Sequence, residues 1–192
     1  MKKYLLLTLS ALTIGCTNLE PAETAHFFDV DSLVTEQILY LADARPEVIK
    51  AGEVQGSAAE ETVTRPDSLQ WTRELAIFKN VDINKPRLRE QYREETKTLD
   101  NGDRQISYVP IEKGDLIVQH ITLRYDGENL RVLEATIKDT NPLYSSKRDI
   151  RMEFEGNADE LRLASYFIEG GQKMRIKDSV TFDLNARISY TD

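Results

Sequence analysis

The chain has 192 residues, of which 40% are hydrophobic and 30% charged, and its formal net charge is −8. These proportions are typical of a chain that folds rather than one that stays disordered. An acidic protein of this size is a poor electrostatic match for nucleic acid or anionic lipid, so we expect no nucleic-acid partner.

The first fifteen residues have the parts of a secretory signal. Lys2 and Lys3 give a positive start, and an apolar stretch from Tyr4 to Gly15 follows them. A helix that crosses a bilayer needs about 20 apolar residues, so this stretch is too short for a permanent span. The sequence therefore predicts that residues 1–15 form an export signal that is removed.

The signal ends in Leu12-Thr13-Ile14-Gly15-Cys16, which resembles the lipobox of bacterial lipoproteins. Thr13 departs from that pattern, since leucine usually stands three positions before the cysteine. Cys16 is the only cysteine of the chain, so it cannot form an intramolecular disulfide. The resemblance implies lipidation of Cys16. In enterobacterial lipoproteins, which this signal resembles, an aspartate after the cysteine retains the protein at the inner membrane. Thr17 stands at that position here, so the resemblance favours the outer membrane. The alternative is an ordinary cysteine at the end of a type I signal, or a cysteine that is buried as a small apolar residue.

The rest of the chain divides into a tether and one domain. Residues 16–26 contain Asn18, Glu20 and Pro21 and show no apolar periodicity, so we expect a lipid-anchored tether. Residues 27–192 are enough for a single domain with its own core.

Apolar residues at three- and four-residue spacing predict two helices before the main run of strands. The first covers residues 30–43, with Asp29 as N-cap and Pro46 as its end. The second follows Asp67 and places Trp71 on a buried stripe against the sheet, together with Leu75 and Phe78. Residues 47–65 are compatible with short strands or with a loop.

From residue 91 onward the apolar period changes to two, which indicates strands. The alternation predicts strands near residues 91–99, 104–109, 116–126, 129–138, 147–155, 160–169, 172–177 and 179–190. Glycines at 102, 127, 156 and the pair 170–171 suit hairpin turns, so we expect an antiparallel meander.

These elements predict an α+β fold. Two N-terminal helices would pack on the apolar face of a twisted antiparallel β-meander of six to eight strands, in a half-barrel-like arrangement. In outline this is similar to the half-barrel lipoprotein-carrier proteins of the periplasm. A likeness at the level of architecture implies little about function.

No pattern of catalytic, cofactor-binding or metal-binding residues stands out. His26 lies in the tether region, and alternation places His120 on the solvated face of a strand, without the partners of a triad. Asp29 and Asp31 lack the glycine and glutamate of a calcium loop, and the carboxylates around Gly102 suit a plain hairpin turn. We therefore expect no enzyme and no cofactor. Cys16 is the one site residue, as the point of lipidation.

The leading hypothesis is a membrane-anchored cell-envelope lipoprotein with a non-catalytic interaction or structural role. Its expected partners are the membrane, through acylated Cys16, and an envelope protein. The alternative is a carrier or binding module for an apolar small molecule or lipid, since a curved sheet can enclose a pocket. A continuous apolar cavity of roughly 300 Å³ or more would favour the carrier. A core filled by Trp71 and Phe78 would favour the interaction protein.

Overall fold

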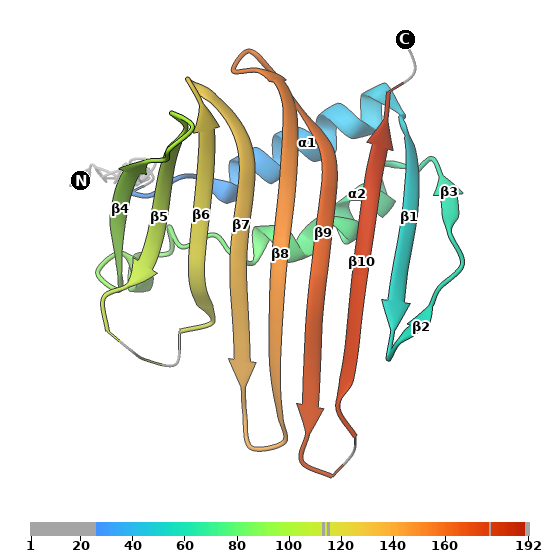
Figure 1. Cartoon of the computed structure of the whole chain (residues 1–192), viewed down its shortest axis with the longest axis vertical. Helices are drawn as coiled ribbons and strands as arrows, with labels where there is room; N and C mark the ends of the chain where they lie inside the picture. The colour runs from blue at the N-terminus through green and yellow to red at the C-terminus, as the bar shows by residue number, and fades with distance from the viewer. Residues whose placement is uncertain (1–25, 113, 115, 177, 191–192) are drawn as a thin grey trace, which may run out of the picture.

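The structure is a computed structural model that describes residues 26–112, 114, 116–176 and 178–190 (Figure 1). The predicted signal, Cys16 and nearly all of the predicted tether lie outside these residues. In the described part, one wide, open antiparallel sheet carries the helices on a single face (Figure 1). None of these helices is long and apolar enough to cross a bilayer.

The helical elements are α1 (Val30–Ala44), α2 (Ser68–Glu74), α3 (Ala76–Lys79) and the 3₁₀ turn η1 (Pro86–Leu88). The strands are β1 (Glu47–Val54), β2 (Ser57–Ala58), β3 (Thr62–Thr64), β4 (Tyr92–Thr98), β5 (Arg104–Pro110), β6 (Val118–Asp126), β7 (Asn129–Thr140), β8 (Tyr144–Asn157), β9 (Glu160–Met174) and β10 (Val180–Ser189). Their order is β2-β1-β10-β9-β8-β7-β6-β5-β4, and β3 also pairs with β1. Strands β4 to β10 therefore form a meander, and β1 returns to lie beside its last strand.

The first helix begins where the sequence predicts and ends one residue later than predicted, at Ala44. The Asp29 side chain accepts a hydrogen bond from the backbone N–H of Ser32 at 2.8 Å. At the other end Arg45 adopts a left-handed conformation just before Pro46. On its inner side, the Gln37 side chain bonds the carbonyl of Leu161 and the N–H of Leu163. These bonds fix α1 to β9 where that strand bulges.

The second helix has the predicted cap and the predicted buried stripe. Asp67 and Gln70 form a reciprocal capping box. Trp71, Leu75 and Phe78 have no exposed surface, so the predicted burial of Trp71 is confirmed. The helix is interrupted at Leu75, which divides it into α2 and α3.

The number and order of elements differ from the prediction. The described sheet has ten strands rather than six to eight, and β1, β2 and β3 lie between α1 and α2. The helices are therefore not both N-terminal to the sheet. The ambiguous residues 47–65 contain these three strands. In β1 the alternation of apolar and polar residues is hidden in the sequence, because the charged Lys50 points to the helical face. There it forms an ion pair with Glu74.

The glycine pair at 170–171 is not a turn, so the two strands expected on either side are one strand, β9. Neither glycine has a positive φ, whereas Gly102 and Gly127 do, at 91° and 59°. A Cβ on Gly170 would lie 2.9 Å from the Phe182 ring and 3.0 Å from the carbonyl oxygen of Lys147. Gly170 is thus required by close packing rather than by chain reversal.

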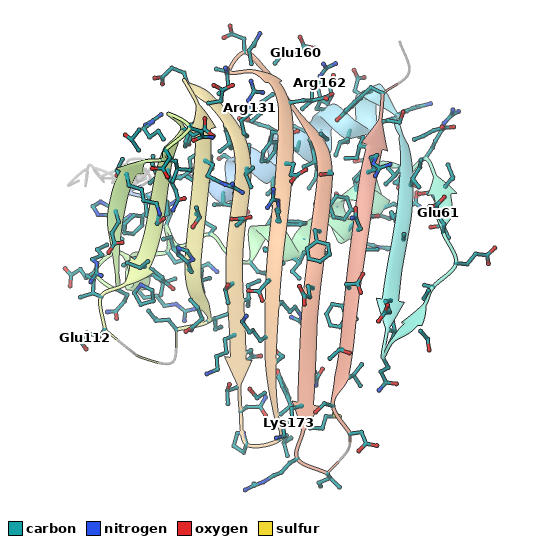
Figure 2. All side chains as sticks on the ribbon, viewed as in Figure 1. Glu61, Glu112, Arg131, Glu160, Arg162 and Lys173 are labelled. Carbon is teal, nitrogen blue, oxygen red and sulfur yellow. The ribbon has the colours of Figure 1, made fainter. Side chains whose placement is uncertain are left out.

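The two faces of the sheet are chemically different. Apolar residues of β6 to β10 alternate toward the helices and join those of α1, α2 and α3 in one core. The opposite face carries the polar and charged members of the same alternation, and no helix of the described residues covers it (Figures 1 and 2). The helices therefore leave this polar side of the sheet uncovered in the described part of the chain.

Candidate functional site

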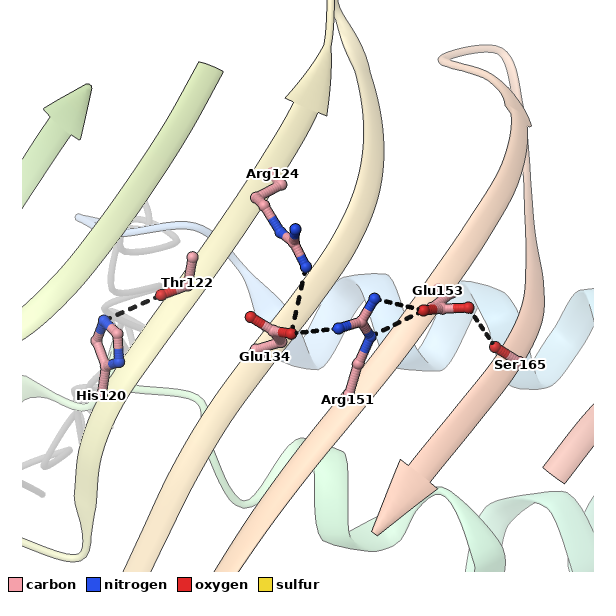
Figure 3. A network of polar contacts seen from close by, with 7 residues as sticks. All are labelled: His120, Thr122, Arg124, Glu134, Arg151, Glu153 and Ser165. Atoms are coloured by element: carbon pink, nitrogen blue, oxygen red, sulfur yellow. Dashed lines mark hydrogen bonds and ion pairs between the residues drawn. The ribbon is translucent and has the colours of Figure 1, made fainter. Parts of the chain in front are cut away.

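We call the helix-free side of β1 and β6 to β10 the open face. Figure 3 shows part of it, with the helices behind the sheet. Strand pairing aligns its side chains in rows that run across the strands, because residues directly opposite each other point to the same side. One such row, a chain of charge pairs beside it and one aromatic side chain define the candidate site.

The aromatic side chain is Phe167 of β9, which is partly buried in an otherwise polar surface. Its direct neighbours are Asn185 on β10 and Arg151 on β8. Three adjoining hollows, of about 640, 360 and 230 Å³, are all lined in part by Phe167. We call them together the Phe167 hollow. Concave surfaces with an apolar centre and a polar surround are the usual form of binding sites.

A chain of charge pairs crosses the open face from β6 to β9 (Figure 3). Glu134 accepts hydrogen bonds from Arg124 at 3.3 Å and from Arg151 at 2.7 Å. Arg151 also donates to Glu153 at 2.8 Å, and Glu153 accepts from the Ser165 hydroxyl at 2.9 Å. All of these ion-pair members are partly exposed, so each pair contributes at most about 1 kcal/mol to stability.

Glu153 remains ionised within this chain. Burial raises the pKa of its carboxyl, but the hydrogen bonds from Ser165 and Arg151 outweigh burial and hold the pKa below its ordinary value. The chain of pairs is therefore electrically satisfied at neutral pH. It orders the surface but leaves no spare charge for a ligand.

His120 lies exposed on the open face of β6, as the alternation predicts. Its Nε2 atom is 3.0 Å from the hydroxyl of Thr122 (Figure 3). Within the described residues no ion pair joins this histidine to a carboxylate. The arrangement is that of a hydrogen-bonded surface histidine.

A row of directly opposite residues places four carboxylates side by side. Glu53 of β1 lies opposite Asp183 of β10, Asp183 opposite Glu169 of β9, and Glu169 opposite Asp149 of β8. We call these four residues the acidic row. Neighbouring strands are about 4.8 Å apart, so each carboxylate faces the next across one strand spacing. All four line the largest part of the Phe167 hollow.

Only one end of the acidic row is neutralised. Asp149 accepts hydrogen bonds from Lys147 at 2.7 Å and from Thr136 at 2.6 Å. Burial raises the pKa of the Asp149 carboxyl, but the two hydrogen bonds outweigh burial and hold this pKa below its ordinary value. The side chains of Glu53, Glu169 and Asp183 form no ion pair or hydrogen bond with any described residue.

The acidic row has an electrostatic cost for the free protein. Like charges directly opposite each other in a sheet destabilise it, by roughly 0.2–1 kcal/mol for each pair. A cation bound in the Phe167 hollow would remove that repulsion and could also lie against the face of the Phe167 ring. The geometry therefore suits an ammonium or guanidinium group.

The sequence did not reveal this site. The four carboxylates are spread from residue 53 to residue 183, and only the pairing of β1 with β10 and of β10 with β9 brings them together. No group of three or more histidine, cysteine, aspartate or glutamate residues in the described part is arranged to hold a metal ion. Cys16 lies outside the described residues. The chain matches no family model, and no curated protein or solved structure shows significant similarity to it.

Proposed function

We propose that this protein is a non-catalytic, lipid-anchored protein of the bacterial cell envelope that binds a cationic partner on its open face. The observation that carries the proposal is the acidic row. Three of its four carboxylates have no partner among the described residues, and all four line one hollow. An acidic surface of this kind attracts a cationic partner over a distance and selects against anionic ones.

The anchor in this proposal rests on the sequence. The order of two lysines, a short apolar stretch and a single cysteine supports export, cleavage and acylation of Cys16, with the outer membrane as the favoured location. Acylated lipoproteins stay on membranes because each buried methylene contributes about 0.8 kcal/mol. Cys16→Ser should abolish labelling by a clickable fatty acid, and unchanged labelling would refute the anchor.

A carrier of apolar molecules has less support. That alternative depends on the half-barrel outline expected from the sequence, with space between the helices and the sheet. Trp71, Leu75 and Phe78 occupy this position and have no exposed surface. Phe78 packs edge-on against Tyr166 of β9, with ring centroids 5.9 Å apart. A hollow of about 640 Å³ lies instead on the open face and is lined in part by charged side chains.

Binding of a cationic partner is tested by isothermal titration calorimetry of the processed, lipid-anchored protein with a tetralysine peptide. The double variant Glu169→Gln with Asp183→Asn removes the centre of the acidic row, and it should weaken binding about tenfold, as expected for loss of close charge pairs. Neither side chain forms a described hydrogen bond, so the fold should be unaffected.

The matched control is Glu60→Gln with Glu61→Gln, which changes the net charge by the same amount. Both glutamates are exposed in the segment between β2 and β3, and Figure 2 labels Glu61. Control binding should equal that of the wild type. An equal loss in both double variants would mean that only net charge matters. Wild-type protein that does not bind the peptide would overturn the proposed function.

A further inference from the structure

Two neighbouring hairpins extend beyond the rest of the sheet. Strands β7, β8 and β9 have 12, 14 and 15 residues, whereas β4, β5 and β6 have seven to nine. At about 3.3 Å per residue the longer strands carry their loops well past their neighbours. The described residues 141–145 of the β7–β8 hairpin and 173–176 of the β9–β10 hairpin lie at the lower end of the molecule in Figure 1. We call residues 141–145 and 173–176 the hairpin tips.

The hairpin tips are held together as one structure. Tyr144 pairs with Met174 across β8 and β9, and the Arg175 N–H donates to the carbonyl of Leu143 at 3.0 Å. The Asn141 side chain accepts hydrogen bonds from the backbone N–H groups of Leu143 and Tyr144. The tips therefore present a defined surface.

That surface is apolar and basic. Ile176 is 92% exposed and Leu143 71%, which are the two highest values among the large apolar residues of the described chain, and Met174 is 40% exposed. Lys173 and Arg175 are exposed beside them, with Asp178 following. The β8–β9 turn, at the opposite end of the sheet, instead carries exposed Asp159 and Glu160 (Figure 2).

We propose that the hairpin tips dock on an anionic lipid surface. Exposed apolar side chains beside lysine and arginine are the combination that enters the headgroup region of a membrane, where the apolar groups leave water and the basic groups meet lipid phosphates. A bilayer needs no matching shape. Three apolar side chains on two narrow tips are too few for a stable protein interface, which buries about 800 Å² on each partner.

Docking at the hairpin tips involves a different part of the molecule from the acidic row and does not depend on that row. The net charge of the whole chain opposes binding to anionic lipid, but the charge at the tips has the opposite sign. An acidic open face and basic tips would orient the molecule with its tips toward the membrane. Docking at the tips would then add a second attachment to the acyl anchor at Cys16.

The test uses tryptophan as a depth probe in the full-length, processed protein. Trp71 is the only native tryptophan and is fully buried, so it gives a constant background. Leu143→Trp and Ile176→Trp place probes on the tips. Leu69→Trp, at a residue of α2 that is 57% exposed, is the matched control. Each variant is reconstituted in vesicles of phosphatidylethanolamine and phosphatidylglycerol that contain brominated phospholipid.

Docking predicts blue-shifted emission and strong quenching by brominated lipid for both tip probes, and neither effect for the control. Adding Lys173→Glu with Arg175→Glu, or high salt, should remove the quenching at the tips. The acyl anchor cannot produce this difference, because all variants carry the same anchor. Solvent-like emission from both tip probes, equal to that of Leu69→Trp, would overturn the proposal.

Discussion

Two buried tyrosines of the same core differ in whether their hydroxyl groups are hydrogen-bonded. Tyr92 is 4% exposed and donates a hydrogen bond of 2.7 Å to the carbonyl oxygen of Val118. Tyr166 is 1% exposed, and its hydroxyl has no partner in the described part of the chain. Burying a polar group without a partner costs free energy, whereas a satisfied one contributes about 1 kcal/mol.

This contrast predicts that substitution by phenylalanine changes the free energy of unfolding differently at the two positions. Tyr92→Phe should lower the free energy of unfolding by about 1 kcal/mol, because the Val118 carbonyl loses its donor. Tyr166→Phe should leave stability unchanged or increase it, because nothing is lost with the hydroxyl. Urea denaturation followed by circular dichroism measures both. Equal losses in the two variants would show that the Tyr166 hydroxyl is bonded after all.

At the scale of single elements, local signals predict the helices and most strand positions. Asp29 and Pro46 delimit α1 because a side-chain cap and a proline act within one or two turns. The stripe that includes Trp71 follows from helical periodicity. Gly170 could not be assigned in this way, because its role depends on Phe182 and Lys147, which lie on the two neighbouring strands.

Substitution of Gly170 by alanine should have a different effect on stability from the same substitution at Gly171. Gly170→Ala should destabilise the protein by about 1–3 kcal/mol, because the added methyl would lie 3.0 Å from the backbone oxygen of Lys147. Gly171→Ala should be neutral or slightly stabilising, because its methyl would come no closer than 3.5 Å to any atom beyond the adjacent residues of the chain. Thermal melts of the two variants decide the point. Similar melting temperatures would imply that β9 shifts to make room.

At the scale of the whole molecule, sequence reasoning predicted an antiparallel sheet with one covered and one polar face. It missed the width of the sheet, because β1 reaches its place only by pairing with the distant strand β10. The acidic row was missed for the same reason. Alternation tells which face a side chain occupies, but only register tells which side chains are neighbours. Glu53 and Asp183 become neighbours through that register alone.

The proposed cation site requires that the carboxylates of the acidic row repel one another in the free protein, so that a bound cation would remove this repulsion. The repulsion is tested most directly by urea denaturation of the free, full-length protein. Glu169→Gln with Asp183→Asn removes all three facing carboxylate pairs. This variant should therefore raise the free energy of unfolding by about 1 kcal/mol over the wild type. Glu60→Gln with Glu61→Gln should stay within about 0.5 kcal/mol. A row variant no more stable than the wild type would contradict the account.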